Sequence, residues 1–356
     1  YQSTAERWSF LRKAGAVGVA AILNPRSMDV AWERLAPMRL APSLALAGPQ
    51  FDETPGMRVS LTINPASADR FFTGTGHTIE EILELDRAGL PLPRFALANT
   101  IRAFQAIDRS EAAAENVVAV LPGRDAGLRD EYIVISAHLD HLGRGAAVEG
   151  DSVYNGALDN AAGVASLFEI ARILKASPPR RSVLFAAVTA EEHGLLGSKY
   201  LAATPGVPGR IMVANLNLDM FQPLHALKLL TVLGLDESSL GRDARAAAKT
   251  AGIMVQADPE PDRNTFIRSD QYSFIRAGIP SLAFRFGYEK GSAEEKIQKD
   301  WLAKRYHAPS DDAPQPVDLN AAARFNRLIA AVAARAGNAA VRPQWNPDSF
   351  FRRFAR

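Results

Sequence analysis

From Asn116 onward, the sequence alternates between short apolar runs of strand length and longer stretches whose apolar residues recur at helical spacing. The strand-like runs are 116–122, 132–138, 182–190, 211–220, 227–234 and 280–287, and the helical stretches are 160–177, 240–252 and 319–337. Strands that alternate with helices indicate an α/β fold with a largely parallel mixed sheet, sandwiched by helices on both faces. Ligand sites in such sheets lie at the carboxyl ends of the strands.

The first part of the chain follows a different pattern, in which short strand-like runs are broken by Pro and Gly. The elements expected there are a helix over 5–14, strands over 17–23, 43–49 and 57–65, and a polar helix over 78–89. No cluster of titratable residues suggests chemistry in this part. We therefore expect a smaller β-rich domain with a connecting segment at 1–112, a domain that carries the chemistry at 113–342, and a tail at 343–356 that docks on the domain surface.

Composition excludes several classes of function. The net charge of +2 gives no case for nucleic-acid binding, and the apolar stretches are too short for a membrane-spanning helix. The chain has no cysteine, which excludes disulfides, thiol catalysis and cysteine-ligated zinc, so any metal must be held by His, Asp and Glu. The first residues contain neither a basic leader nor a small-residue cleavage site, so no signal peptide is predicted.

Titratable side chains stand at the ends of successive predicted strands. They are His138 and Asp140, then Glu191 and Glu192, then Asp219, with Asp159 at the start of a predicted helix and His307 in a loop after a helix that contains Trp301. Two adjacent glutamates at the end of a buried strand are costly unless a cation or a reaction uses them. Because their side chains diverge, one can bind a metal while the other reaches a water molecule.

Each of these residues alone also has a structural interpretation. Asp159 could cap a helix, Asp219 could lie in a surface loop and His307 could be an ordinary surface histidine. The same holds for His141, His193 and His225, for which we expect no role. Together, however, two histidines and three carboxylates at one sheet edge require cations, and two Zn²⁺ would be balanced by three carboxylates and a bridging hydroxide.

Five motifs in a fixed order carry a family resemblance: "SAHLDHLG", "GALDNAAG", "TAEEHGLLGSKYL", "NLDM" and "YHAPSDD". Over roughly residues 113–340, the chain resembles the di-zinc aminopeptidases that include bacterial leucyl aminopeptidases and glutamate carboxypeptidase-type enzymes. The resemblance implies a zinc exopeptidase fold and two Zn²⁺ ions per chain. Residues 1–75 resemble the second half of a protease-associated domain, an apical insertion in many members, and the family suggests a periplasmic or secreted location.

The resemblance also implies a role for each site residue. The match to Asp159 bridges the two zinc ions, His138 and Asp219 complete one metal site, and Glu192 and His307 complete the other. The match to Glu191 is the general base, and the match to Asp140 orients the first histidine. In this family the peptide bond after the bridging aspartate is cis, so we expect a cis bond between Asp159 and Asn160.

The leading hypothesis is therefore a zinc-dependent aminopeptidase that cleaves N-terminal residues from peptides. A carboxypeptidase of the glutamate carboxypeptidase type is the alternative among enzymes, and Arg268, Arg285 and Lys304 are candidates for the basic pocket it would need. A receptor-like binding ectodomain on the same fold is disfavoured because every metal ligand is present. A mono-zinc acyltransferase of the glutaminyl cyclase type is a further alternative.

Two residues depart from the pattern of some relatives. Phe266 stands three residues before the "SD" motif, where some relatives have a tyrosine that stabilises the oxyanion, and Gln271 stands where many have a histidine. Neither change removes a predicted metal ligand. Oxyanion stabilisation is therefore expected to fall mainly on zinc.

Overall fold

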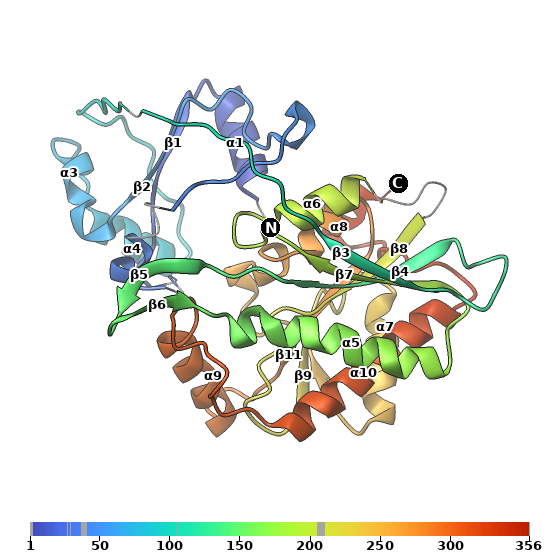
Figure 1. Cartoon of the computed structure of the whole chain (residues 1–356). Coiled ribbons are helices and arrows are strands. Elements are labelled where there is room, and N and C mark those ends of the chain that lie inside the picture. Colours follow the sequence, from blue (N-terminus) through green and yellow to red (C-terminus); the bar gives the residue numbers. More distant parts are fainter. Residues whose placement is uncertain are drawn as a thin grey trace. The chain divides into compact units, whose positions relative to one another are not determined.

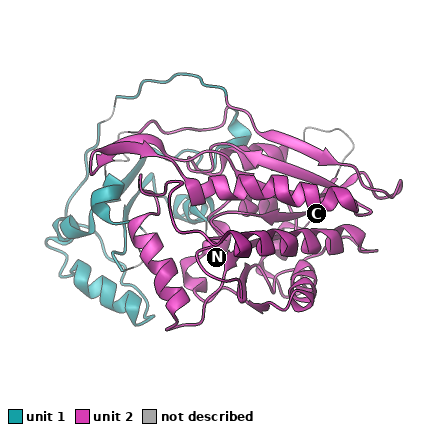
Figure 2. Ribbon diagram, turned by 60° about the horizontal axis from the view of Figure 1, so that its bottom comes forward, with its two compact units in different colours: residues 1–39, 48–113 teal, residues 40–47, 114–356 magenta. Residues whose placement is uncertain are grey.

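A computed structural model describes residues 3–26, 28, 30–36, 41–104, 106–204 and 211–355. The chain divides into two compact units, drawn in different colours in Figure 2. The first unit comprises residues 1–39 and 48–113, and the second comprises residues 40–47 and 114–356. None of the described helices is long and apolar enough to cross a membrane.

The first unit is small and has little core. Its helices and strands are α1 (Thr4–Lys13), β1 (Gly18–Ile22), α2 (Trp32–Leu35), β2 (Val59–Ile63), α3 (Asp69–Phe72) and α4 (Ile79–Arg87). Strands β1 and β2 form a parallel pair, and a capping box at Ser3 and Glu6 starts α1. The run 43–49, which lies mostly in the second unit, was expected as a strand but forms none: its side chains are mostly exposed, and none of the described strands pairs with it.

The second unit is built on a seven-stranded mixed sheet (Figure 1). Its strands are β3 (Val117–Leu121), β4 (Glu131–His138), β7 (Ser182–Val188), β8 (Ile211–Asn217), β9 (Leu229–Leu233), β10 (Met254–Gln256) and β11 (Ser281–Phe286), in the order β10-β9-β11-β8-β4-β7-β3. The central strands β11, β8, β4 and β7 are parallel, while β3 and β9 run antiparallel to their neighbours β7 and β11. The predicted α/β fold with a largely parallel mixed sheet is confirmed.

Helices cover both faces of this sheet. They are α5 (Ala162–Ala176), α6 (Leu196–Ala203), α7 (Leu240–Thr250), α8 (Gln271–Arg276), α9 (Ala293–Lys304) and α10 (Leu319–Asn338). On β4, Ile133 and Ile135 pack with α5, α7 and α10, while Tyr132 and Val134 pack with α6 and α8 on the opposite face. Because both faces are buried, the strand reads as an almost continuous apolar run.

Three parts of the second unit differ from or extend the expected pattern. The hairpin of β5 (Gly143–Val148) and β6 (Asp151–Tyr154) was not predicted, because its residues are mostly exposed and show no apolar run. The short strand β10 was also missed, since it follows α7 after a turn of three residues. The C-terminal tail docks as expected: Trp345 and Phe351 are buried in a cluster with Leu233 and Phe266.

Candidate metal centre

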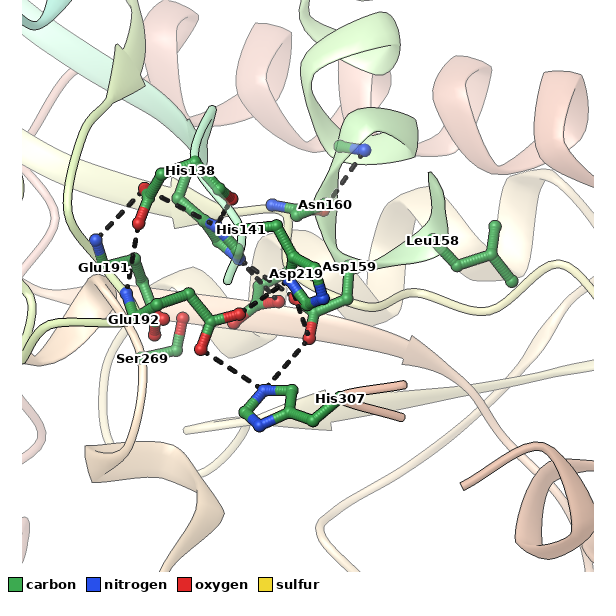
Figure 3. A network of polar contacts seen from close by, with 12 residues as sticks. His138, His141, Leu158, Asp159, Asn160, Glu191, Glu192, Asp219, Ser269 and His307 are labelled. Atoms are coloured by element: carbon green, nitrogen blue, oxygen red, sulfur yellow. Dashed lines mark hydrogen bonds and ion pairs between the residues drawn. The ribbon is translucent and has the colours of Figure 1, made fainter. Parts of the chain in front are cut away.

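The central strands bring the predicted site residues to one edge of the sheet. Strand β4 lies between β7 and β8, and all three are parallel, so their carboxyl ends meet. His138 is the last residue of β4, Asp219 follows β8, and Glu191 and Glu192 follow β7. Asp159 and His307 reach the same place from the turn before α5 and the loop after α9 (Figure 3).

One group of ligand atoms surrounds His138. Its Nε2 atom lies 3.2 Å from Asp159 Oδ1 and 3.4 Å from Asp219 Oδ1. The ligand atoms of these three residues all lie within 4.8 Å of one another. This spacing leaves room for one cation among a nitrogen and two carboxylate oxygens.

A second group shares Asp159. His307 Nε2 lies 3.4 Å from Asp159 Oδ2 and 3.2 Å from Glu192 Oε2. His141, for which the sequence predicted no role, also joins this group, because its Nδ1 lies 2.8 Å from Glu192 Oε1 and 3.9 Å from Asp159 Oδ2. Asp159 therefore presents one oxygen to each group, as a bridging carboxylate between two metals would.

Several buried polar atoms of the site lie close to one another, yet their orientation gives them no hydrogen bond. They are His138 Nε2, both ring nitrogens of His141, Glu192 Oε1 and Asp219 Oδ1. Buried polar atoms are nearly always satisfied, so five such atoms in one place indicate a missing partner. Histidine nitrogens and carboxylate oxygens are the ligands that zinc takes where no thiolate is present, and the residues therefore fit two zinc ions.

The turn that carries Asp159 is held by a buried carboxylate far along the chain. The peptide bond between Asp159 and Asn160 is cis, as the family resemblance implied. The backbone N–H groups of Leu158 and Asp159 donate to the Asp311 carboxylate at 3.0 Å each, and the Asn160 side chain donates to the Leu218 carbonyl at 2.9 Å. These contacts tie the turn to the end of β8. Asp311 belongs to the "YHAPSDD" motif, but its role was not predicted.

Asp140 contacts both the first histidine and the two adjacent glutamates. The nearest partner of His138 Nδ1 is the backbone carbonyl of Asp140, at 3.0 Å, whereas the Asp140 carboxylate is 3.8 Å away. That carboxylate instead accepts the backbone N–H groups of Glu191 and Glu192, at 3.1 and 3.3 Å. One residue thus orients the first histidine through its main chain and fixes the glutamate pair through its side chain.

The electrostatics of the site separate the two glutamates. Burial raises the pKa of Glu191 well above its usual value, and the negative charges of Asp219 and Asp270 add to this. Burial acts in the same direction on Glu192, but His141 and His307 outweigh it and keep the pKa of Glu192 below its usual value. Glu191 is therefore suited to hold and release a proton, and Glu192 to remain an anionic ligand.

The histidines and the bridging aspartate complete this pattern. Burial lowers the pKa of His307, but contacts with Asp159 and Glu192 outweigh it and raise the pKa to about 9. Asp159 and Asp219 likewise raise the pKa of His138 against the effect of burial. In return, the two histidines hold the pKa of Asp159 low although it is buried. Protons on the histidines thus supply the positive charge that the carboxylates require.

The two residues that depart from the pattern of some relatives have contacts of their own. Phe266 is buried, with its ring 5.3 Å from that of Phe351, and Gln271 bridges Asn217 and the Phe266 carbonyl by hydrogen bonds of 2.8 and 2.9 Å. Tyr306, for which the sequence predicted no role, has its ring centroid 3.9 Å from that of His307. Burial raises the pKa of Tyr306 far above its usual value, so it remains a hydrogen-bond donor beside the centre.

The fold and the donor set define a site for two metal ions at the carboxyl edge of an α/β sheet. The family model described as peptidase family M28 matches residues 116–333, which is more than half of the chain. This range contains all seven residues predicted for the site. The chain belongs to peptidase family M28.

Individual relatives match over shorter stretches. The chain is 37% identical over 105 residues to a probable zinc metalloprotease of Pyrenophora teres f. teres, covering 29% of this chain and 22% of that protein. It is 30% identical over 161 residues to the aminopeptidase YwaD of Bacillus subtilis, covering 44% of this chain and 32% of that protein. The matched stretches thus span a third or less of these curated relatives.

A solved structure extends the fold comparison to most of the chain. The aminopeptidase from Aneurinibacillus sp. strain AM-1 is 20% identical, with a TM-score of 0.52 over 95% of this chain and 67% of that one. At this identity, the likeness concerns the fold.

Proposed function

We propose that this protein is a zinc-dependent aminopeptidase that removes N-terminal residues from peptides. The observation that carries the proposal is the position of Asp159, whose two carboxylate oxygens face the His138 group and the His307 group separately. His138, Asp159 and Asp219 would hold one zinc ion, and Asp159, Glu192 and His307 the other. Membership in peptidase family M28 and the names of the matched relatives support a peptide substrate and zinc.

The chain's own residues would divide the remaining work. Zinc bound here would polarise the scissile carbonyl and lower the pKa of a water molecule. Glu191 would accept the proton of the attacking water and pass it to the leaving amine, which its raised pKa favours. Tyr306 would remain a neutral donor beside the reacting carbonyl, and Asp140 would keep Glu191 and Glu192 in place.

The rest of the predicted organisation belongs to the same proposal. Residues 1–112 would form a module resembling part of a protease-associated domain and limit access to the site without supplying a ligand. The tail 343–356 would stabilise the peptidase domain, and the protein would act in the periplasm or outside the cell.

The test combines metal content with a panel of aminoacyl p-nitroanilides. We expect two zinc ions per chain in protein purified without chelators, and hydrolysis that stops on chelation and returns with zinc. A receptor-like binding domain would cleave none of the substrates. A metal content well below one per chain would contradict the proposal directly.

A further inference from the structure

The second unit contains a cavity of about 60 Å³ that opens in part to solvent. Helix α9 forms one wall with Gln298, Lys299 and Leu302. Gln222 contributes from the loop after β8, and Arg285 contributes from β11. This volume has room for a few water molecules or for a small group such as a carboxylate.

This cavity is linked to the candidate metal centre through an apolar cluster and through the loop after β8. Leu302 lines it and also packs against a small apolar cluster that contains Leu158 and Met220. These two residues are the chain neighbours of Asp159 and Asp219, which are predicted metal ligands. Gln222 itself follows Asp219 by three residues. A substrate held at the metal centre could therefore place one of its groups in the cavity.

Two unsatisfied donors belong to the cavity wall. Gln222 is buried, and its Nε2 atom has no hydrogen-bond partner. Arg285 is half-buried, and no hydrogen bond or ion pair of its guanidinium is found within the described part of the chain. The Thr231 hydroxyl, opposite Arg285 on β9, accepts from Gln256 Nε2 at 2.8 Å, which leaves its own proton to be donated. An acceptor in the cavity would satisfy the two donors and could also receive a hydrogen bond from Thr231.

The other cations of the wall have carboxylate partners. Arg263 contacts Glu260 at 3.1 Å, and Lys299 contacts Glu295 at 2.6 Å. The fifth charged residue, Asp258, accepts the backbone N–H of Glu260 at 2.9 Å. Burial lowers the pKa of Arg263, and the positive charges of Arg268 and Arg285 lower it further. Among the described cations of the wall, Arg285 is therefore the one without a carboxylate partner.

We propose that the cavity binds a carboxylate of the peptide substrate, with Arg285 and Gln222 as its principal donors. The proposal rests on the proposed peptidase function. A guanidinium can hold both oxygens of a carboxylate in two parallel hydrogen bonds, and a neutral amide can add a third. The carboxylate could be an acidic side chain of the N-terminal residue or the chain terminus of a short peptide.

An apolar substrate group would fit the cavity less well. A leucine side chain would displace water from Arg285 and Gln222 without replacing its hydrogen bonds, and buried donors without a partner are disfavoured. An isosteric amide would satisfy some donors but would leave the guanidinium charge uncompensated. The cavity should therefore select for charge as well as for size.

The first arm of the test compares glutamyl, glutaminyl and leucyl p-nitroanilides with the zinc-loaded enzyme. If the cavity binds an acidic side chain of the N-terminal residue, we expect kcat/KM for the glutamyl substrate to exceed that for the glutaminyl substrate by about tenfold or more. Arg285→Met should remove most of this preference, mainly through KM, and should raise leucyl hydrolysis relative to glutamyl hydrolysis, because the guanidinium no longer has to lose water. Gln222→Leu should reduce the preference by a smaller factor.

The second arm compares leucyl-glycine with leucyl-glycinamide. A chain-terminal carboxylate would give a preference for the free acid that Arg285→Met removes, with no preference among the p-nitroanilides. Arg285→Lys keeps the charge and loses the paired donors, so it should give intermediate values in either arm. Lys304→Met is the matched control, because Lys304 is exposed and pairs with Asp300 away from the cavity wall.

Failure of this proposal differs from failure of the proposed function. Hydrolysis of the leucyl substrate without any preference for a carboxylate would overturn the cavity proposal and leave the peptidase function intact. A protein that holds zinc and cleaves none of the substrates would overturn the function. Calorimetric titration with glutarate would then test the cavity proposal separately. Glutarate binding to the wild type that Arg285→Met abolishes would support the proposal. Absence of binding to both proteins would contradict it.

Discussion

The two halves of the candidate metal centre are built in different ways. His138 and Asp219 stand at or just after the ends of neighbouring central strands, and their side chains are 1% and 11% exposed. Glu192 and His307 stand in loops, His307 with a φ of 53° and a side chain 15% exposed. The positions of His138 and Asp219, which we call the sheet-held group, are set by the strands of the sheet. Glu192 and His307 form the loop-held group, in which Glu192 is positioned by contacts with Asp140 and His141.

The largest effect should come from a residue that lies beside the loop-held group without being a ligand. Glu191→Gln keeps the size of the side chain but cannot accept a proton, and loss of a general base costs about 10²–10⁴-fold in rate. We expect kcat to fall by this factor while two zinc ions remain bound. Turnover and metal content measured on one preparation check it. Loss of zinc from this variant would mean that the roles of Glu191 and Glu192 are exchanged.

A pair of ligand variants tests whether the two halves differ in strength. Glu192→Gln and Asp219→Asn each remove one negative ligand, the first from the loop-held group and the second from the sheet-held group. We expect each to lower zinc content toward one per chain and activity by about tenfold or more. Added zinc should restore Glu192→Gln at lower concentration, because the loops can adjust. Equal recovery of both variants would remove the proposed distinction.

The same division explains what the sequence could predict. The central strands are buried on both faces and can therefore be identified as apolar runs. A polar residue that ends such a run lies at the carboxyl edge of the sheet. His138, Asp219 and the glutamate pair could therefore be placed at this edge. The roles proposed for them stay predictions. Asp311 was missed because its contacts with Leu158 and Asp159 join residues about 150 positions apart. No local pattern encodes such a contact.

His141 was missed for a related reason. A histidine three residues beyond a strand gives no signal of its own, and the contact with Glu192 exists only after the turn following β7 has folded against the end of β4. The exposed hairpin β5–β6 was missed because the alternation used to recognise strands depends on a buried face. Sequence patterns therefore predicted what the core dictates and not what long-range contacts hold in place.

A smaller effect is expected when the support of the loop-held group is removed. His141→Ala takes away the imidazole whose Nδ1 lies 2.8 Å from Glu192 Oε1. Residues that support metal ligands contribute about 10–100-fold in metal affinity, so we expect a loss of this size for one zinc ion and none for the other. Competition with a chelator measures both affinities. The exposed His193, next to Glu192 in the chain, provides the control variant His193→Ala, and an equal loss there would deny His141 a specific role.

The smallest effect is expected in the pH dependence of the melting temperature of the metal-free protein. It compares the two halves because each contains one histidine with a raised pKa. Folding raises the pKa of His307 to about 9, above its usual value near 6.5, because Asp159 and Glu192 outweigh the effect of burial. The stability gained from protonated His307 is therefore fully present below about pH 6.5 and is lost as the pH rises through about 9. His138 shifts in the same direction. The melting temperature of the metal-free protein should thus fall by several degrees between pH 6.5 and 9.

Bound zinc should reverse this trend, because zinc binds neutral imidazole and its stabilising effect grows as protons leave. Metal-free His307→Asn and His138→Asn should each show a flatter fall than the wild type, measured by thermal melting at constant ionic strength. If the fully buried His138 is held more rigidly among its carboxylates, its variant should lose more stability at pH 6.5 than the His307 variant does. Identical profiles for both variants would show that strands and loops hold the two histidines equally well, and a wild-type melting temperature that rises with pH would contradict the charge pairing itself.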